Sequence, residues 1–213
     1  MSDHLATAVV HLIDDDAAVR AALELLLASQ GYTVHSHESG DAFLALPDPG
    51  EIGAIILDIR MPGLSGLALQ EMLAERAAKL PIIFITGHGD VEQCARAFRG
   101  GAIDFLPKPV NRAQLIDSLR RAFRLSISRQ ARDVAIKDAS ERLARLSERE
   151  HDILERVVDG CSSKEIAREL DLSPRTVEAH RASLFAKLEV GSLAELIRLY
   201  LSADRVASAT PMP

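Results

Sequence analysis

The chain has few of the features that accompany secretion, disulfide bonding or membrane insertion. It contains only two cysteines, Cys94 and Cys161, whose wide separation suggests neither a metal site nor a disulfide framework. No apolar stretch approaches the roughly 20 residues needed to cross a bilayer. The N-terminal residues lack the basic and apolar regions of a signal peptide. We therefore expect a cytoplasmic protein with no membrane contact.

Excess positive charge is also absent. The 25 Lys and Arg residues are outnumbered by 31 Asp and Glu, for a formal net charge of −6. This balance argues against a protein covered in basic surface for binding nucleic acid or anionic membrane, but it is compatible with a local DNA-binding face. At 213 residues and 47% hydrophobic content, the chain can build one large domain or two ordinary ones.

Short apolar runs alternate with helical patterns over about the first 110 residues, without internal repeats. The runs predict strands at Val9–Ile13, Thr33–His37, Ala54–Leu57, Ile82–Thr86 and Phe105–Lys108. The intervening patterns predict helices at Ala17–Gln30, Asp41–Leu46, Leu67–Ala78 and Val91–Arg99. This alternation predicts an α/β fold with a doubly wound, five-stranded parallel sheet and right-handed crossovers.

Polar residues follow the predicted strands where each one ends. Asp14 and Asp15 follow the first strand, and Asp58 follows the third. Thr86 ends the fourth strand and Lys108 the fifth. Sites in open parallel sheets form beyond the carboxyl ends of the strands, so these side chains are expected to converge.

Each of these residue types suits a separate chemical task. Clustered carboxylates without His or Cys favour a hard cation such as Mg²⁺. With the cation bound, Asp58 could attack phosphorus to give an acyl phosphate, while the Lys108 ammonium and the Thr86 hydroxyl stabilise the transferred group. A cis bond between Lys108 and Pro109 would aim the lysine into the cleft, but the isomer cannot be read from sequence.

Simpler interpretations exist for each residue taken alone. An aspartate run after a strand is often a solvated turn or a helix N-cap, and Asp16 is expected to cap the helix that follows it. A threonine at a strand end is usually structural, and a Lys-Pro pair is usually a turn. Only the ordered set of residues favours a site.

The set resembles the receiver domain of two-component response regulators over about residues 7–123. The resemblance rests on Asp14-Asp15, Ile56-Leu57-Asp58, Met61-Pro62-Gly63-Leu64-Ser65-Gly66, Thr86-Gly87-His88-Gly89-Asp90 and Gly101-Ala102-Ile103-Asp104-Phe105-Leu106-Pro107-Lys108-Pro109. It implies a flavodoxin-like fold and phosphorylation of Asp58 by a sensor histidine kinase. It also implies Mg²⁺ bound by Asp15, Asp58 and the backbone carbonyl of Arg60, with Asp14 supporting through water. Thr86 and Phe105 match the switch pair of that family, in which the hydroxyl moves toward the phosphate and the aromatic ring turns inward.

Two departures from the receiver pattern concern the dimer face. Val110 stands where an aromatic residue often follows Lys-Pro, and Arg99 and Gly100 lie in a helix where small apolar residues are common. In the family that this region resembles, that helix and its neighbours usually form the dimer face of the activated protein.

The pattern of residue types changes after Pro109. Residues 111 to about 139 contain no proline or glycine, and apolar residues recur at three- and four-residue steps. This pattern predicts one long helix that leaves the first domain. This helix is either a solvated linker or a surface that packs against a partner, and the sequence is compatible with both.

The remaining chain, from Glu141 to Leu201, reads as helical throughout. Ser147 and Glu150 form a capping box at the start of one helix. A short helix follows at Lys164–Leu170, and then a tight turn leads to a third helix capped by Ser173. Ser192 is placed to cap a fourth helix. This spacing predicts a helix-turn-helix.

Charge alone does not identify this region as DNA-binding. Residues 163–187 carry five Lys or Arg against four acids, which a small protein-binding helical bundle would also show. The motifs are more specific. Leu146-Ser147-Glu148-Arg149-Glu150, Lys164-Glu165-Ile166-Ala167, Ser173-Pro174-Arg175-Thr176-Val177-Glu178 and His180-Arg181 resemble the LuxR-type helix-turn-helix over about residues 142–205.

Together with the receiver, this region resembles the FixJ subfamily of transcriptional regulators. The resemblance implies that Arg175, Thr176, Glu178 and Arg181 lie near the DNA groove, with Lys164 and Lys187 near phosphates. Three departures are Ser163 in place of a frequent asparagine, Asp171 where a small residue is common, and Gly191 at a position that is often basic.

The predicted organisation is a receiver at 1–124, a helical linker at 125–141, a LuxR-type DNA-binding domain at 142–207 and a disordered tail at 208–213. We expect a non-enzymatic regulator, an activator of transcription, that forms a homodimer on phosphorylation, binds double-stranded promoter DNA and contacts RNA polymerase. His35 and His37 are interpreted as structural.

Two alternative functions fit less of the sequence. A haloacid-dehalogenase-like phosphatase would carry its nucleophile on the first strand with a second aspartate two residues on, whereas Asp58 follows the third strand and Arg60 holds the second position. A DNA-binding protein that dispenses with phosphate would not need the complete acidic set.

Overall fold

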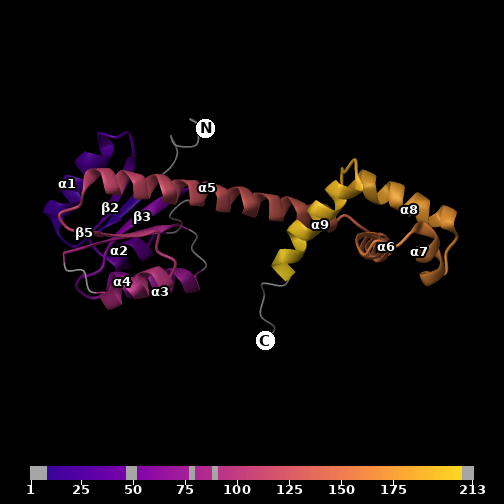
Figure 1. The fold of residues 1–213 in the computed structure, drawn as a ribbon, viewed down its shortest axis with the longest axis horizontal. Helices are drawn as coiled ribbons and strands as arrows, with labels where there is room; N and C mark the ends of the chain where they lie inside the picture. Colours follow the sequence, from indigo (N-terminus) through magenta and orange to yellow (C-terminus); the bar gives the residue numbers. More distant parts are fainter. Residues whose placement is uncertain (1–8, 47–51, 77–79, 88–90, 208–213) are drawn as a thin grey trace. The chain divides into compact units, whose positions relative to one another are not determined.

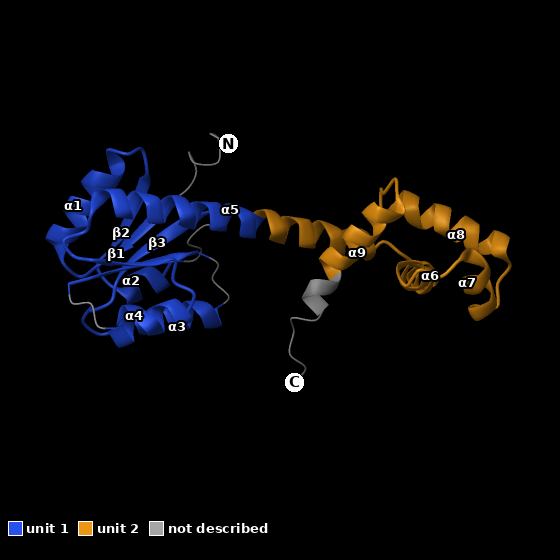
Figure 2. Ribbon diagram, in the orientation of Figure 1, with its two compact units in different colours: residues 1–130 blue, residues 131–213 orange. Residues whose placement is uncertain are grey.

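The computed structural model describes residues 9–46, 52–76, 80–87 and 91–207, with side chains to 203. The predicted disordered tail and the His88-Gly89-Asp90 segment lie outside the described residues. The chain divides into two compact units, Met1–Gln130 and Ala131–Pro213 (Figure 2). They are called here the N-terminal and C-terminal units, and each is described by itself.

The N-terminal unit is built on a five-stranded parallel sheet, as predicted. Its strand order is β2-β1-β3-β4-β5. The strands are β1 (Val9–Ile13), β2 (Thr33–His37), β3 (Gly53–Asp58), β4 (Ile82–Thr86) and β5 (Asp104–Pro107). The predicted fifth strand was displaced by one residue, because Lys108 lies just beyond the last strand residue rather than in it.

Helices cover both faces of this sheet. Helices α1 (Ala17–Ala28) and α5 (Arg112–Leu143) lie on one face, and α2 (Gly40–Leu44), α3 (Gly66–Glu75) and α4 (Val91–Arg99) lie on the other (Figure 1). Asp16 caps α1 as predicted, since its side chain accepts hydrogen bonds from the backbone N–H groups of Ala18 and Val19. The helix ends two residues earlier than predicted, before a left-handed Gly31 with φ of +83°.

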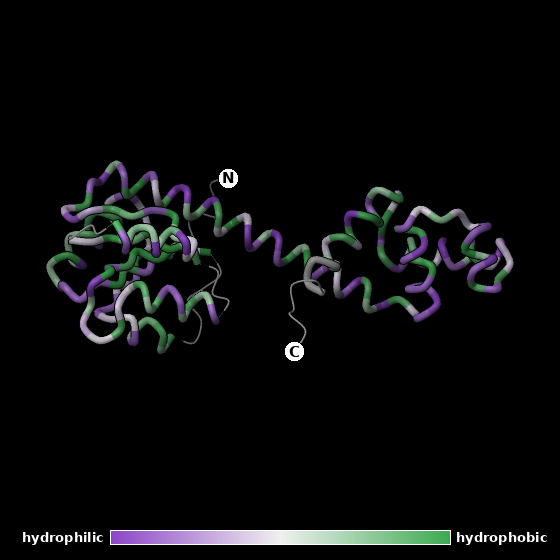
Figure 3. Tube along the Cα trace, turned by 60° about the horizontal axis from the view of Figure 1, so that its bottom comes forward, coloured by the Kyte–Doolittle hydropathy of each residue, from purple (hydrophilic) through white to green (hydrophobic). Residues whose placement is uncertain are grey.

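The strands contribute to two apolar cores because both faces of the sheet are covered. One core packs residues of β1, β3 and β4 against α1 and α5, with Leu27, Leu119 and Phe123 as large buried members. The other packs the opposite strand faces against α2, α3 and α4, with Phe43 and Phe84 at its centre. Figure 3 shows the hydrophobic colour concentrated in the sheet, whereas the helices alternate.

The long helix predicted after Pro109 is α5, which spans 32 residues. Its first part is buried against the sheet through Leu115, Leu119 and Phe123. Farther along, Val134 is 62% exposed. Both interpretations of this part of α5, a solvated linker and a surface that binds a partner, therefore stay predictions.

The C-terminal unit is all-helical, as predicted. It contains the end of α5, then α6 (Glu148–Val158), α7 (Ser163–Glu169), α8 (Pro174–Lys187) and α9 (Leu193–Ala207). Their shared core is apolar, and Ile153, Leu154, Ile166, Val177 and Leu184 are its central members. Ser147 caps α6 through the predicted capping box with Glu150, and Ser173 caps α8 ahead of Pro174. Within the described part of the chain, no helix combines the length and apolarity that a membrane crossing requires.

Candidate phosphoacceptor site and helix-turn-helix

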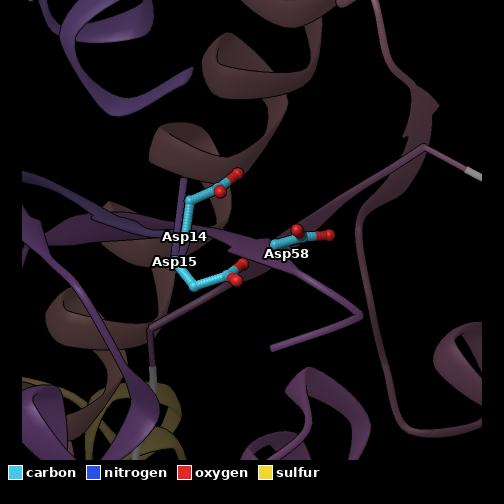
Figure 4. Close-up of side chains that lie close together, drawn as sticks. All are labelled: Asp14, Asp15 and Asp58. Atoms are coloured by element: carbon cyan, nitrogen blue, oxygen red, sulfur yellow. The ribbon is translucent and has the colours of Figure 1, made fainter. Parts of the chain in front are cut away.

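Three aspartates converge at the carboxyl end of the sheet (Figure 4). Ile13 of β1 pairs with Leu57 of β3, so the next residues, Asp14 and Asp58, are neighbours. Ligand oxygens of Asp14, Asp15 and Asp58 all lie within 4.8 Å of one another. Asp14 is fully buried and Asp58 is 5% exposed, whereas Asp15 is exposed. The strand order reverses between the neighbouring strands β1 and β3, and ligand sites form at such a point in open α/β sheets.

Lys108 bridges the two buried acids. Its ammonium Nζ donates to Asp14 Oδ2 at 2.6 Å and to Asp58 Oδ2 at 2.8 Å. The backbone N–H of Lys108 donates to the carbonyl oxygen of Thr86 at 2.7 Å, which anchors the residue beside β4. The Lys108–Pro109 peptide bond is cis.

Burial and charge pairing oppose each other at this cluster. Burial raises the pKa of Asp14 and outweighs the hydrogen bonds and charge of Lys108, which act to lower it. Burial alone would lower the pKa of Lys108, but its bonds to Asp14 and Asp58 reverse the effect and the pKa is raised. The lysine is therefore firmly protonated and serves as the counter-ion of the acids.

The backbone around Asp58 is held by a residue without a side chain. A Cβ atom added at Gly66 would lie 2.2 Å from the carbonyl oxygen of Asp58, so helix α3 can begin this close to the strand end only with glycine. The N–H of Gly66 also donates to the carbonyl of Ile59 at 3.0 Å. The glycine therefore couples the start of α3 to the position of Asp58.

One supporting contact of the site was missed by sequence reasoning. The guanidinium of Arg20 on α1 donates to the backbone carbonyl of Asp14 at 2.7 Å. An arginine within an otherwise ordinary amphipathic helix carries no local signal of this role. Arg60, predicted to offer its carbonyl to the metal, is exposed and donates its N–H to Asp58 Oδ1 at 3.4 Å.

Thr86 and Phe105 lie on neighbouring strands. Thr86 is fully buried, and Phe105 is half-buried against the core on the α3 and α4 side. Phe105 pairs with Phe84, which precedes Thr86 by two residues. The side chains of Thr86 and Phe105 therefore project from the same face of the sheet. A cleft of about 700 Å³ opens beside the acids, lined by Asp15, Arg60 and Arg96 among others.

In the C-terminal unit, α7, a tight turn and α8 form a helix-turn-helix. Asp171 in the turn has a φ of +53°, a left-handed conformation that aspartate tolerates better than most residues. Of the predicted DNA contacts, Lys164 and Arg175 are exposed, and Arg181 is half-buried. The hydroxyl of Thr176 is 2.7 Å from that of Ser173 at the start of α8.

Two predicted DNA contacts have partners within the unit that the sequence did not reveal. The Ser163 hydroxyl of α7 donates to the Glu178 carboxylate of α8. Lys187 Nζ donates to Glu150 Oε2 at 2.7 Å. Glu150 also accepts hydrogen bonds from Ser147 and Ser183, and it is only 3% exposed. Burial would raise the pKa of Glu150, but Lys187 and the serine donors outweigh it and lower the pKa to about 2.

A receiver-type sheet with an acidic cluster at its switch point, followed in the chain by a helix-turn-helix, defines a phosphorylation-regulated protein with a DNA-binding output. Comparison with known families agrees. Residues 10–120 match the response regulator receiver domain, and residues 144–200 match the luxR family of bacterial regulatory proteins.

Similar proteins extend over nearly the whole chain. The transcriptional regulatory protein FixJ of Azorhizobium caulinodans is 44% identical over 91% of this chain and 92% of its own length. The response regulator protein TodT of Pseudomonas putida is 37% identical over 93% of this chain and 87% of its own length. The solved structure of response regulator StyR has a TM-score of 0.81 at 37% identity, covering 91% of this chain and 98% of that one.

The chain belongs to the FixJ-like two-component response regulators, which join a receiver to a LuxR-type DNA-binding domain. A receiver implies a histidine kinase as partner, and a LuxR-type domain implies DNA as ligand. The family consists of transcription regulators and not enzymes, so the phosphatase alternative is dropped. The acidic triad is consistent with a metal site.

Proposed function

We propose that Asp58 is the phosphoacceptor. In this reaction a carboxylate oxygen of Asp58 attacks the phosphorus of a phosphohistidine on the kinase. An O–P bond forms, the P–N bond breaks, and the imidazole leaves with the bonding electron pair. The observation that supports this role is the placement of Asp58 at the switch point, with its Oδ2 2.8 Å from Lys108 Nζ.

Lys108 and Thr86 are proposed to stabilise the transferred group. The Lys108 ammonium would neutralise phosphoryl charge, and the Thr86 hydroxyl would donate to a phosphoryl oxygen. The cleft beside Asp15 and Arg60 offers a path by which the donor reaches Asp58.

Mg²⁺ is the cation that the donor set favours. Three carboxylates without nitrogen or sulfur ligands suit a hard cation that retains water. Asp15, Asp58 and the carbonyl of Arg60 are proposed to hold it, with Asp14 acting through water. When bound, the cation supplies charge neutralisation for the phosphoryl group.

The output is proposed to be a phosphorylation-promoted homodimer. Movement of Thr86 toward the phosphate would let Phe105 turn inward and change the surface around α4 and β5. Two helix-turn-helix units would then bind paired half-sites of promoter DNA, and the dimer would activate transcription with RNA polymerase. Pairing strengthens binding because the second unit acts at a raised effective concentration.

The proposed DNA contacts lie on α7 and α8, within a DNA-binding domain that we assign to residues 142–207, after a receiver at 1–124 and a linker at 125–141. Lys164 and Lys187 are assigned to phosphates, and Arg175, Thr176, Glu178 and Arg181 to the groove. The hydrogen bonds of Glu178 and Lys187 within the unit mean that both side chains must exchange a partner to reach DNA.

Acetyl phosphate with Mg²⁺ tests the proposal. The wild-type protein is expected to gain one phosphoryl mass, to shift toward dimer in size-exclusion chromatography, and to bind tighter to duplexes selected from a randomised library. Asp58→Asn should show none of these changes, whereas Asp41→Asn, at an exposed position on α2, should behave as wild type. An adduct of equal yield in Asp58→Asn would refute the assignment of the acceptor. An adduct without a change in assembly or DNA affinity would refute the switch.

A further inference from the structure

A cluster of three histidines lies on the same sheet as the acidic site but outside it. His11 belongs to β1, and His35 and His37 belong to the edge strand β2. In the parallel register, His11 pairs with His35, and Ile13 pairs with His37. Side chains alternate along a strand, so all three imidazoles project from one face, the face covered by α2 (Figure 1).

Two of these imidazoles meet nitrogen to nitrogen. His11 Nδ1 is 3.2 Å from His37 Nε2, and the rings are stacked with centroids 5.5 Å apart. Phe43 of α2 packs against both rings edge-on, at centroid distances of 5.2 and 5.4 Å. His11 is 2% exposed, so this pair is firmly held in place.

The spacing of the pair fits two interactions. A separation of 3.2 Å is at the long end of a hydrogen bond. Two nitrogens bound to one tetrahedral zinc ion, each at 2.0–2.1 Å, would be about 3.3 Å apart. The same two rings could therefore chelate a metal ion with little movement, once a change of tautomer moves the proton between them to the other nitrogen of its ring.

The third histidine, His35, can supply a third nitrogen ligand. The ring of His35 makes an edge contact with that of His11, with centroids 5.7 Å apart, and its side chain is exposed. Its nitrogens lie outside the 4.8 Å range that the acidic triad meets among the described residues, so the ring must turn to join a shared ion. Exposure on an edge strand leaves room for that rotation and gives an ion a path from solvent.

We propose that His11, His35 and His37 form a binding site for a borderline divalent metal ion, with Zn²⁺ as its representative. A His-X-His pair on one strand with a third histidine on the adjacent strand presents three nitrogens and no carboxylate, which selects Zn²⁺, Ni²⁺ or Cu²⁺ over Mg²⁺. Water would complete a tetrahedral shell.

One backbone contact joins this cluster to the acidic site. The backbone carbonyl of His37 accepts the N–H of Asp14 at 3.2 Å, which joins this strand end to the acidic site. An ion that fixes β2 would thus stiffen the turn that carries Asp14 and Asp15.

Zinc titration of the full-length, tag-free protein tests the proposal. Isothermal calorimetry with ZnCl₂ is run in excess Mg²⁺, which occupies the acidic site, and Co²⁺ absorption spectra report on a tetrahedral nitrogen shell. We expect one Zn²⁺ per chain at micromolar concentration. His37→Ala should weaken binding by about 100-fold or more, because loss of a ligand exceeds the 10–100-fold cost of losing an outer-shell partner. His35→Ala should weaken it by at least about tenfold.

Matched variants separate this site from others. His180→Ala, on α8 of the C-terminal unit, and Asp58→Asn should both bind Zn²⁺ as wild type does. His11 is left intact because its burial would confound folding with binding. Saturation only at millimolar Zn²⁺, or affinity unchanged by His35→Ala or His37→Ala in variants with native circular dichroism, would overturn the proposal and leave the histidines as packing residues.

Discussion

Replacing Lys108 with methionine is the most direct test of the electrostatics of the acidic site. Methionine keeps the length of the side chain but removes the only ammonium that contacts Asp14 and Asp58 among the described residues. At 2.6 and 2.8 Å and an effective dielectric constant of about 20, each contact is worth roughly 6 kcal/mol before solvation. The ionised carboxylates, with oxygens within 4.8 Å, repel one another by about 3.5 kcal/mol per pair.

The net effect is smaller than these pair energies. Forming the pair desolvates Lys108 and both acids, and Asp14 can take up a proton in the variant because burial already raises its pKa. Removal of one member of a buried pair typically costs about 3–5 kcal/mol. The Lys108 side chain is 19% exposed, which favours the lower end. We therefore expect about 3 kcal/mol of lost stability without divalent ions, or a fall in Tm of roughly 10 °C for the N-terminal unit.

Scanning calorimetry with EDTA or Mg²⁺ measures this change. Mg²⁺ should stabilise Lys108→Met more than wild type, because a divalent cation can replace the missing ammonium. Arg121→Met is the matched control. It removes an exposed cation that pairs with Asp104 and Asp117 in the same unit, and it should cost no more than about 1 kcal/mol. Equal losses in the two variants, or an equal response to Mg²⁺, would refute the view that Lys108 is the counter-ion of the site.

Three further predictions concern other parts of the chain. Because the pKa of His37 is lowered from 6.5 to about 4, the unfolded chain binds the proton more tightly, so stability should fall as pH drops from 6.5 toward 4 and stay level above. Urea unfolding in EDTA should show a loss of about 2 kcal/mol that His37→Gln abolishes, and an unchanged slope in that variant would contradict the cause. Glu189 follows the end of α8 with a φ of +54°, so Glu189→Gly should stabilise the C-terminal unit by about 0.5–1 kcal/mol in thermal unfolding; a loss would show that its surface contacts matter more. Ser163→Ala frees the Glu178 carboxylate, so selection from randomised duplexes should show a changed base preference at one position per half-site, and an identical consensus would argue that Glu178 does not read a base.

The fold of this protein was largely accessible from sequence because its strands are short apolar runs that stop at polar residues. Val9–Ile13 and Ile82–Thr86 end at the same residues in the sequence pattern and in the structure. Helix ends were less accurate, as in α1, which ends at Ala28 with Ser29 as its C-cap rather than at Gln30, the residue before the glycine.

The order of polar residues at strand ends also placed the acidic site. Parallel strands bring their carboxyl ends to one edge, so the convergence of Asp14 and Asp58 follows from topology. Sequence could not separate the fully buried Asp14 from its exposed neighbour Asp15, because the difference depends on which side of the strand end each faces.

Contacts between distant residues with no shared motif could not be predicted. Glu150 was recognised as half of a capping box, but its pairing with Lys187, 37 positions later, depends on how α6 packs against α8. Likewise, His35 and His37 were interpreted as structural because no cysteine or carboxylate pattern lies near them in the sequence. The contact of His37 with His11, 26 residues away on another strand, was not predicted.

The pairing of Lys187 with Glu150 has a consequence for how salt should affect DNA binding. A basic side chain makes the DNA affinity depend on salt only if its contact with a phosphate produces a net release of counterions. Each such contact contributes about 0.9 to the magnitude of the slope of log K against log salt. Lys187 already has a carboxylate as its counterion, so leaving it for a phosphate exchanges one anion for another. Of the two proposed phosphate contacts, Lys164 should then set the slope, near 1 per DNA-binding domain rather than near 2. With the proposed contacts, the buried Glu150 of α6 is expected to make promoter binding less sensitive to ionic strength.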